Sequence, residues 1–270
     1  MIPIRIDDPE DPRIAAYRDI RERDLVGRQG LFVAEGKVVL NVLFSARRFE
    51  TESVLLLENR LAGMADTLAL APEGTPLYIA SADILDRIAG FHMHRGVLAI
   101  GRRREQPAID ALLDELPADA LVLALIGIAN HDNMGAIFRN AAAFGADAVL
   151  IDPTCCDPLY RKAIRVSVGA ALKIPFATAS DPKSLIEKLA TRDFAGIALS
   201  PSGGREIGEY RTSGRVALFL GAEGPGLPRN VLAALETVRI RMAKGFDSLN
   251  VAAASAIALH HFAQNRWTKD

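Results

Sequence analysis

Short, almost entirely apolar segments alternate with helical patterns over the second half of the chain, and this alternation constrains the fold most. The segment "ALVLALIGIA" at 120–129 is typical, because it has no polar residue for a solvent-facing side. Strands that are apolar on both faces belong to parallel sheets covered by helices on both sides. The sequence therefore predicts a parallel α/β domain. Its strands are expected at 121–128, 147–152, 174–177, 196–200, 215–221 and 238–242, and its helices at 133–144, 158–170, 182–191, 228–235 and 248–266.

A charged segment separates this region from the first part of the chain. The segment, "GRRREQPAIDALLDELPADA" at 101–120, contains two prolines and divides regions with different rhythms. Before it, helical patterns and short strands indicate a small α/β domain. We therefore expect an N-terminal domain at 1–105, a linker at 106–119 and the parallel α/β domain at 120–270.

Bulk properties exclude several classes of protein. The formal net charge is -1, so nucleic-acid binding would need local basic patches rather than the overall charge. The longest apolar run is too short to span a bilayer, and the first residues carry acids where a signal peptide would be apolar. Cys155 and Cys156 are adjacent, and no Cys and His residues have zinc-ligand spacing. We expect a cytoplasmic protein that binds no membrane and no metal.

Three polar or glycine-rich segments follow expected strands, where parallel α/β sheets bind their ligands. The first, at 128–145, contains Asn133, which is expected to cap the following helix. It also contains Arg139, which lies off the apolar stripe of that helix. Most helix arginines are simply solvated, but an arginine in so apolar a helix also suits a phosphate partner.

The second segment, at 218–232, places Gly221, Gly224 and Gly226 around Glu223. This spacing differs from the Gly-x-Gly-x-x-Gly fingerprint of dinucleotide-binding folds. The glycines indicate either a flexible turn or a backbone that must approach a ligand closely.

The third segment, "GFDSLNV" at 245–251, begins an alanine-rich helix. Ser248 is expected to be its N-cap. A cap at Ser248 does not account for Asn250 two residues later, and a helix N-terminus after a strand suits the electronegative atoms of a ligand. We interpret this helix start as capped and in use at the same time.

Together the three segments resemble the motifs of the SpoU (TrmH-like) family of RNA ribose 2'-O-methyltransferases, within the SPOUT superfamily. "NMGAIFR" at 133–139 is similar to the first motif, residues 221–226 to the Gly-x-Glu-Gly-x-Gly of the second, and residues 248–251 to the Ser-Leu-Asn-Val of the third. The resemblance covers about 120–266. One departure is "IRMAKG", where the family usually has Ile-Pro-Met, so that Arg241 replaces a proline.

The resemblance implies a fold, a cofactor and an activity. The C-terminal domain would carry a trefoil knot, which is exceptional among proteins, and the N-terminal domain would be an L30e-like RNA-binding domain. S-adenosyl-L-methionine would be the cofactor, and a ribose 2'-OH of ribosomal or transfer RNA would receive the methyl group. The protein would act as a homodimer whose active site draws on both subunits.

The resemblance also implies roles for individual residues. We expect Arg139 to hold an RNA phosphate and favour a developing alkoxide, because a guanidinium is very hard to deprotonate. Glu223 is a plausible proton acceptor. The catalytic residues are expected to be Arg139, Glu223, Asn133, Ser248 and Asn250. The cofactor contacts are expected to be Gly221, Glu223, Gly224, Gly226, Ile240, Met242 and Leu249. The RNA contacts are expected to be Arg139, Arg161, Lys162, Arg165, Arg102, Arg103 and Arg104.

Two other functions are compatible with parts of the pattern. An RNA-binding protein of the same fold that has lost methyl transfer is one, although it need not keep all five catalytic residue types. A nucleotide- or phosphate-binding α/β enzyme of another class is the other. The missing dinucleotide fingerprint and the Ser-Leu-Asn-Val segment argue against it.

Overall fold

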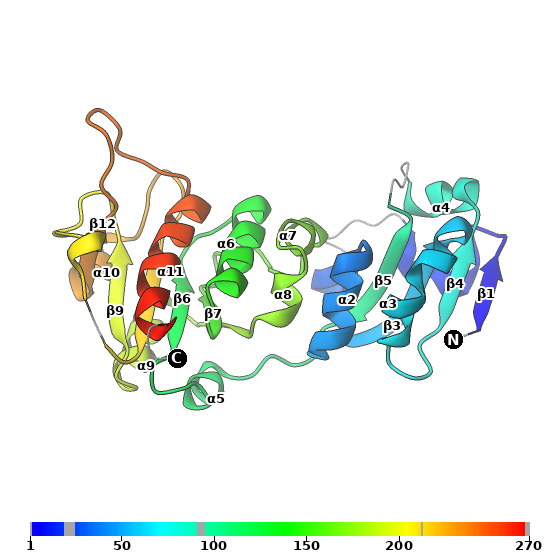
Figure 1. Cartoon of the computed structure of the whole chain (residues 1–270), viewed down its shortest axis with the longest axis horizontal. Coiled ribbons are helices and arrows are strands. Elements are labelled where there is room, and N and C mark those ends of the chain that lie inside the picture. Colours follow the sequence, from blue (N-terminus) through cyan, green and yellow to red (C-terminus); the bar gives the residue numbers. More distant parts are fainter. Residues whose placement is uncertain (1, 19–24, 91–94, 212, 268–270) are drawn as a thin grey trace. The chain divides into compact units, whose positions relative to one another are not determined.

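Two compact units make up the protein. The first combines Met1–Glu105 with Pro158–Lys173, and the second combines Gln106–Asp157 with Ile174–Asp270. Each unit has its own sheet, whose strands can be followed in Figure 1. The computed structural model describes residues 2–18, 25–90, 95–211 and 213–267.

The first unit is built on a mixed five-stranded sheet with the order β1-β4-β3-β5-β2. β1, β4 and β3 run parallel, whereas β5 is antiparallel to both of its neighbours. Phe32, Phe44 and Tyr17 are among its fully buried side chains. The strands are β1 (Pro3–Ile6), β2 (Leu31–Glu35), β3 (Glu50–Leu57), β4 (Leu77–Ala80) and β5 (Val97–Arg102). The helices are α2 (Lys37–Ala46), α3 (Ala65–Ala69) and α4 (Ala82–Ala89), with 3-10 helices at Pro12–Tyr17 and Glu58–Met64 and a π-helical turn at Leu25–Gln29.

The helix expected at 158–170 is divided into α7 (Arg161–Val166) and α8 (Ala170–Lys173). Between them, Val168 and Gly169 have φ values of 54° and 87°. This left-handed conformation interrupts a helix of L-residues. A Cβ at Gly169 would lie 3.0 Å from Cβ of Val42, so glycine also lets the turn pack closely against α2.

The segment that contains α7 and α8 packs with the first unit, although its place in the sequence lies between two parts of the second. Nε of Arg161 lies 3.0 Å from Oε2 of Glu35, and the two side chains are only 14% and 9% exposed. From its position in the sequence, this segment was expected to belong to the domain at 120–270. A partner 126 residues away cannot be read from a local pattern, which is why the grouping differs.

The second unit is built on a seven-stranded sheet with the order β10-β12-β9-β11-β6-β7-β8. Every neighbouring pair in this sheet is parallel, which confirms the predicted parallel α/β sheet. The strands are β6 (Leu121–Leu125), β7 (Ala148–Ile151), β8 (Phe176–Thr178), β9 (Ala195–Leu199), β10 (Arg205–Glu206), β11 (Val216–Leu220) and β12 (Glu236–Arg239).

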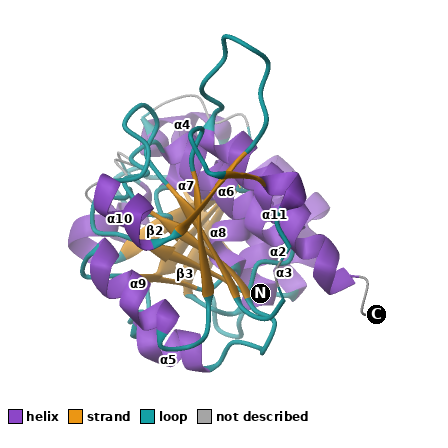
Figure 2. Ribbon diagram, turned by 90° about the vertical axis from the view of Figure 1, so that its left-hand side faces the viewer, coloured by secondary structure: helices purple, strands orange, loops and turns teal. Residues whose placement is uncertain are grey.

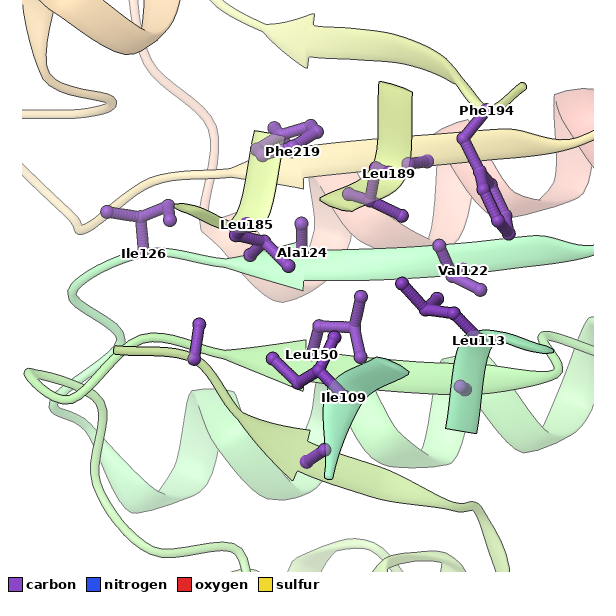
Figure 3. Close-up of a cluster of buried hydrophobic side chains, with 14 of the residues drawn as sticks. Ile109, Leu113, Val122, Ala124, Ile126, Leu150, Leu185, Leu189, Phe194 and Phe219 are labelled. Atoms are coloured by element: carbon purple, nitrogen blue, oxygen red, sulfur yellow. The ribbon is translucent and has the colours of Figure 1, made fainter. Parts of the chain in front are cut away.

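Side chains alternate between the two faces of this sheet. Val122 and Ala124 of β6 face a core shared with α5 and α9, which lie side by side (Figures 2 and 3). On the other face, α11 packs against α6 and β11. The expected linker at 106–119 contains α5, whose Ile109, Leu112 and Leu113 are part of the core. The helices are α5 (Ile109–Asp114), α6 (His131–Ala143), α9 (Pro182–Ala190), α10 (Arg229–Ala234) and α11 (Val251–Trp267), with a 3-10 turn at Ile207–Glu209. None of the helices in the described ranges is long and apolar enough to cross a membrane.

Gly203 offers a test of how closely the chain packs at the edge of this sheet. A Cβ at Gly203 would lie 2.3 Å from the backbone carbonyl carbon of Val238. The contact is with the main chain of β12, which cannot move aside as easily as a flexible side chain. We expect Gly203→Ala to lower the free energy of unfolding by about 1–3 kcal/mol. In Gly204→Ala the new Cβ would have its nearest neighbour at 3.8 Å, so this variant is the matched control. Equal denaturation midpoints for the two variants would contradict the close approach.

Candidate active site

One side-chain amide connects the three segments that the sequence singled out. Nδ2 of Asn250 donates to Oδ1 of Asn133 at 3.0 Å and to Oε1 of Glu223 at 2.7 Å. Asn133 belongs to α6, which follows β6, Glu223 follows β11, and Asn250 directly precedes α11. The amide nitrogen of asparagine carries two hydrogens, so one side chain can make both bonds. The structure therefore brings together three of the five predicted catalytic residues.

Asn250, and not Ser248, caps α11. The helix begins at Val251, and Oδ1 of Asn250 accepts from the amides of Ala252 at 3.0 Å and Ala253 at 3.2 Å. Ser248 is exposed and lies before the helix. The prediction that Ser248 caps a helix starting at 248 was therefore wrong. Asparagine is placed here because its oxygen caps the helix while its nitrogen bridges to the other two segments.

The cap of α6 is Asn130, and not Asn133 as predicted. Oδ1 of Asn130 accepts from the amides of Asp132 at 2.8 Å and Asn133 at 3.2 Å. Asn133 lies inside the first turn of the helix and is buried, which leaves its side chain to accept from Asn250. Two asparagines at one helix start therefore divide the capping and bridging between them.

A further asparagine, outside the predicted site residues, fixes α6 against α11. Nδ2 of Asn140 donates to the carbonyl oxygen of Ala252 at 2.8 Å and to Oγ of Ser255 at 2.9 Å. Ser255 is fully buried and donates to the same carbonyl at 2.7 Å. Asn140 follows Asn133 by two helical turns, so the two share a helix face. That spacing was the signal available in the sequence.

The glycines after β11 are required by the loop itself. A Cβ at Gly221 would lie 2.3 Å from the backbone of both Gly226 and Leu227. The amide of Gly226 donates to the carbonyl oxygen of Ala222 at 3.0 Å, and Gly224 and Gly226 have φ values of 85° and 69°. The loop thus folds back on itself through a close backbone contact. It holds Glu223, which is exposed, where Asn250 can reach it.

Most of the remaining predicted residues of the second unit are accessible. Arg139 is exposed on α6, and the structure gives it no hydrogen bond or ion pair with any residue in the described ranges. Ser248 and Leu249 are also exposed, whereas Ile240 and Met242 are half-buried. Among the described residues, no group of three or more His, Cys, Asp or Glu side chains could hold a metal ion.

The other basic residues predicted to contact RNA belong to the first unit. Arg161 forms the buried ion pair with Glu35, so the structure gives it a packing role that leaves little of its charge accessible. Arg102 forms an ion pair with Glu52, and Nε of Arg104 lies 3.5 Å from Oε1 of Glu50. The exposed basic side chains of this set that lie on α7 are Lys162 and Arg165.

Comparisons with known proteins agree with this arrangement. The model of the SpoU rRNA methylase family matches residues 120–260. The chain is also 41% identical over 263 residues to an uncharacterised tRNA/rRNA methyltransferase of Mycobacterium bovis, a match that covers 94% of this chain and 89% of the relative. The chain belongs to the SpoU rRNA methylase family. The expected membership of the SpoU family is thereby confirmed.

A further relative and a solved structure extend the comparison. A 23S rRNA (guanosine-2'-O-)-methyltransferase of Bordetella pertussis is 31% identical over 195 residues, which cover 72% of this chain and 80% of that protein. The crystal structure of an AdoMet-bound rRNA methyltransferase from Sinorhizobium meliloti has a TM-score of 0.79, covers 97% of this chain and 98% of its own, and is 23% identical. At that identity, the structural match shows that the two proteins share a fold.

Substitutions at Asn250 separate its two roles. Asn250→Ala removes the cap and both bridging bonds, and we expect the free energy of unfolding to fall by about 1 kcal/mol or more. Asn250→Asp keeps an oxygen for the cap but sets a carboxylate against Glu223. The pKa of one of these two carboxyl groups should then rise in the folded state. The free energy of unfolding of this variant is therefore higher at low pH, where that group is protonated, and falls as the pH rises through the raised pKa.

We therefore expect the melting temperature of Asn250→Asp to approach that of the wild type as the pH falls from about 7 to about 5. Asn230→Asp, at an exposed position of α10, is the matched control and should show no such recovery. Identical pH dependence in the two variants would show that Asn250 and Glu223 do not interact.

Proposed function

We propose that this protein transfers a methyl group from S-adenosyl-L-methionine to a ribose 2'-OH of ribosomal or transfer RNA. The hydrogen-bonded set Asn133–Asn250–Glu223 is the observation that carries the proposal, because it joins the three SpoU motifs at the carboxyl end of the sheet. The activity named for the Bordetella pertussis relative and the cofactor in the Sinorhizobium meliloti structure support it.

The residues around the loop after β11 suit this cofactor. A Cβ at Gly224 or Gly226 would meet nothing within 4 Å, so the backbone there faces open space. Ile240 and Leu249 offer apolar contact for an adenine, and Gly221 and Met242 would complete the set. When bound, S-adenosyl-L-methionine supplies an electrophilic methyl group on a positively charged sulfur.

The protein's own side chains would orient the 2'-OH and receive its proton. The carboxylate of Glu223 uses Oε1 to accept from Asn250, which leaves Oε2 to take the proton of the attacking hydroxyl. Arg139 would hold an RNA phosphate and stabilise negative charge on the attacking oxygen. Ser248 does not cap α11, so its hydroxyl can hydrogen-bond the ribose. Asn133 keeps Asn250 in place by accepting from its amide.

We further infer that the second unit carries a trefoil knot and that the first, L30e-like, unit recognises RNA. β12 lies two places from β11 in the sheet, whereas α11 packs against α6 on the far side of β11. The segment 240–250 between them therefore passes the loop after β11, where Asn250 contacts Glu223. This crossing supports a threaded path. Lys162 and Arg165 are the basic side chains of the first unit that we would test first for RNA contact.

A homodimer is the assembly that we propose. Apolar side chains are exposed at and before α11: Phe246 is 74% exposed, Leu249 43% and Ile257 41%. A second copy of the chain would cover Phe246 and Ile257 and add residues to the site, next to the cofactor contact at Leu249. We expect Ile257→Glu to shift the mass measured by light scattering from dimer to monomer, since it places a charge in the interface. An unchanged dimer mass would exclude α11 from the interface.

Methyl transfer from labelled S-adenosyl-L-methionine to total RNA, separated into ribosomal and transfer pools, tests the proposed activity. We expect alkali-resistant 2'-O-methyl dinucleotides in one pool. Arg139→Ala should lower the rate by about 10²–10³. Arg229→Ala, an exposed arginine on α10, is the matched control and should keep the wild-type rate.

The failures of this experiment are informative. Cofactor binding without label in either pool would favour a non-catalytic RNA-binding protein of the same fold. Absence of both label and cofactor binding would refute the proposed methyltransferase.

A further inference from the structure

Glu206, at the end of the edge strand β10, faces two arginines that flank Ile240. Its Oε1 lies 3.4 Å from Nη2 of Arg239 and 3.5 Å from Nε of Arg241. Arg239 is also held by the carbonyl oxygen of Gly203, to which its Nη1 donates at 2.8 Å. The side chains on both sides of Ile240 therefore lie close to one carboxylate.

The segment that carries Glu206 is itself fixed to β12. Arg205 and Glu206 pair with Val238 and Arg239 in the parallel register of the sheet. The amide of Ser200 donates to the carbonyl oxygen of Val238 at 3.0 Å. Gly203 closes against the backbone of the same strand. Glu206 is thus held against β12 by the sheet. Its contact with Arg241 lies beyond Arg239, the last residue of that strand.

The chain that follows has little support of its own. Most residues from Arg241 to Asn250 are exposed, and in Figure 1 this orange segment projects from the second unit. Within it, the amide of Phe246 donates to the carbonyl oxygen of Ala243 at 3.2 Å. Asn250 fixes its far end through the bonds to Asn133 and Glu223. Glu206 fixes its near end.

The two arginines contribute differently. The side chain of Arg239 is 39% exposed and that of Glu206 22%, whereas that of Arg241 is 82% exposed. An isolated pair as exposed as Arg241 and Glu206 contributes little, because water screens the charges and both side chains must be ordered. Here Arg239 already orders the carboxylate, so Arg241 meets a fixed partner. The resulting contact remains sensitive to salt.

We propose that Glu206 is a positioning residue for the cofactor segment 240–249. By holding Arg239 and Arg241, it fixes the backbone around Ile240 before the cofactor binds. An ion pair thus restrains the position where Arg241 stands in place of the proline usual in the family, whose ring would restrict the backbone covalently. The proposal rests on the proposed function, since the segment is there assigned to the cofactor.

Glu206→Gln tests the proposal, because it removes the charge and keeps the shape. We expect the Kd and KM for S-adenosyl-L-methionine to rise about fivefold while kcat stays close to that of the wild type. High salt should weaken wild-type binding toward that of the variant. Arg241→Gln should have a smaller effect, and the double variant should bind no more weakly than Glu206→Gln alone. Glu209→Gln, an exposed glutamate three residues further on, is the matched control.

Limited proteolysis supplies a readout that needs no cofactor. Trypsin should cleave after Lys244 faster in Glu206→Gln than in the wild type or Glu209→Gln, since the segment loses its near anchor. Equal cleavage rates and equal Kd values, with wild-type binding intact, would overturn this inference alone. Equal losses of kcat, affinity and melting temperature would also overturn it, because they indicate general destabilisation. If the wild type binds no S-adenosyl-L-methionine, the proposed function fails, and the cofactor role of Glu206 fails with it.

Discussion

The arrangement of the site depends on the hydrogen bonds of one group, the side-chain amide of Asn250. Its oxygen caps α11, and its nitrogen donates to Asn133 and Glu223, so one side chain connects three segments that are far apart in the sequence. Asn133 is buried, where an unpaired polar group would be costly, so its bond to Asn250 is needed for stability as well as for position. The cap and the site are therefore built by the same group.

The surrounding contacts hold this arrangement rigid. Asn140 and Ser255 fix α6 against α11, and the close backbone contact at Gly221 shapes the loop that presents Glu223. The polar contacts between α6 and α11 lie on one face of a parallel sheet whose other face is closed by an apolar core with α5 and α9. Arg139, in contrast, is left exposed. The protein thus fixes the groups that orient one another and leaves accessible the arginine that we propose contacts RNA.

Most helices and strands of the second unit followed from the sequence because their patterns are local, whereas α5 and the two-residue strand β10 were not expected. The apolar runs at β6 and β11 and the glycines after β11 were recognisable without a structure. Helix caps were less predictable. Asn130 and Asn133, like Ser248 and Asn250, are alternative capping residues within one short segment, and local preference does not choose between them. The bridge between Asn133 and Asn250 joins residues more than 100 positions apart in the chain, so local preference does not show which residues of each segment form it.

The sequence by itself determined the parallel α/β sheet, the three motif segments and, through them, the family. Periodicity and spacing indicate the sheet and the glycine turns, because each strand, helix and turn obeys local steric and hydrophobic rules, whereas the family follows from the resemblance of the motif residues. Only the tertiary structure decided that α7 and α8 pack with the first unit, that Arg161 is used in a buried ion pair, and that Glu206 faces the two arginines around Ile240. The residues around a charged side chain in the sequence do not show which residue it pairs with, since an ion pair forms wherever folding brings opposite charges together.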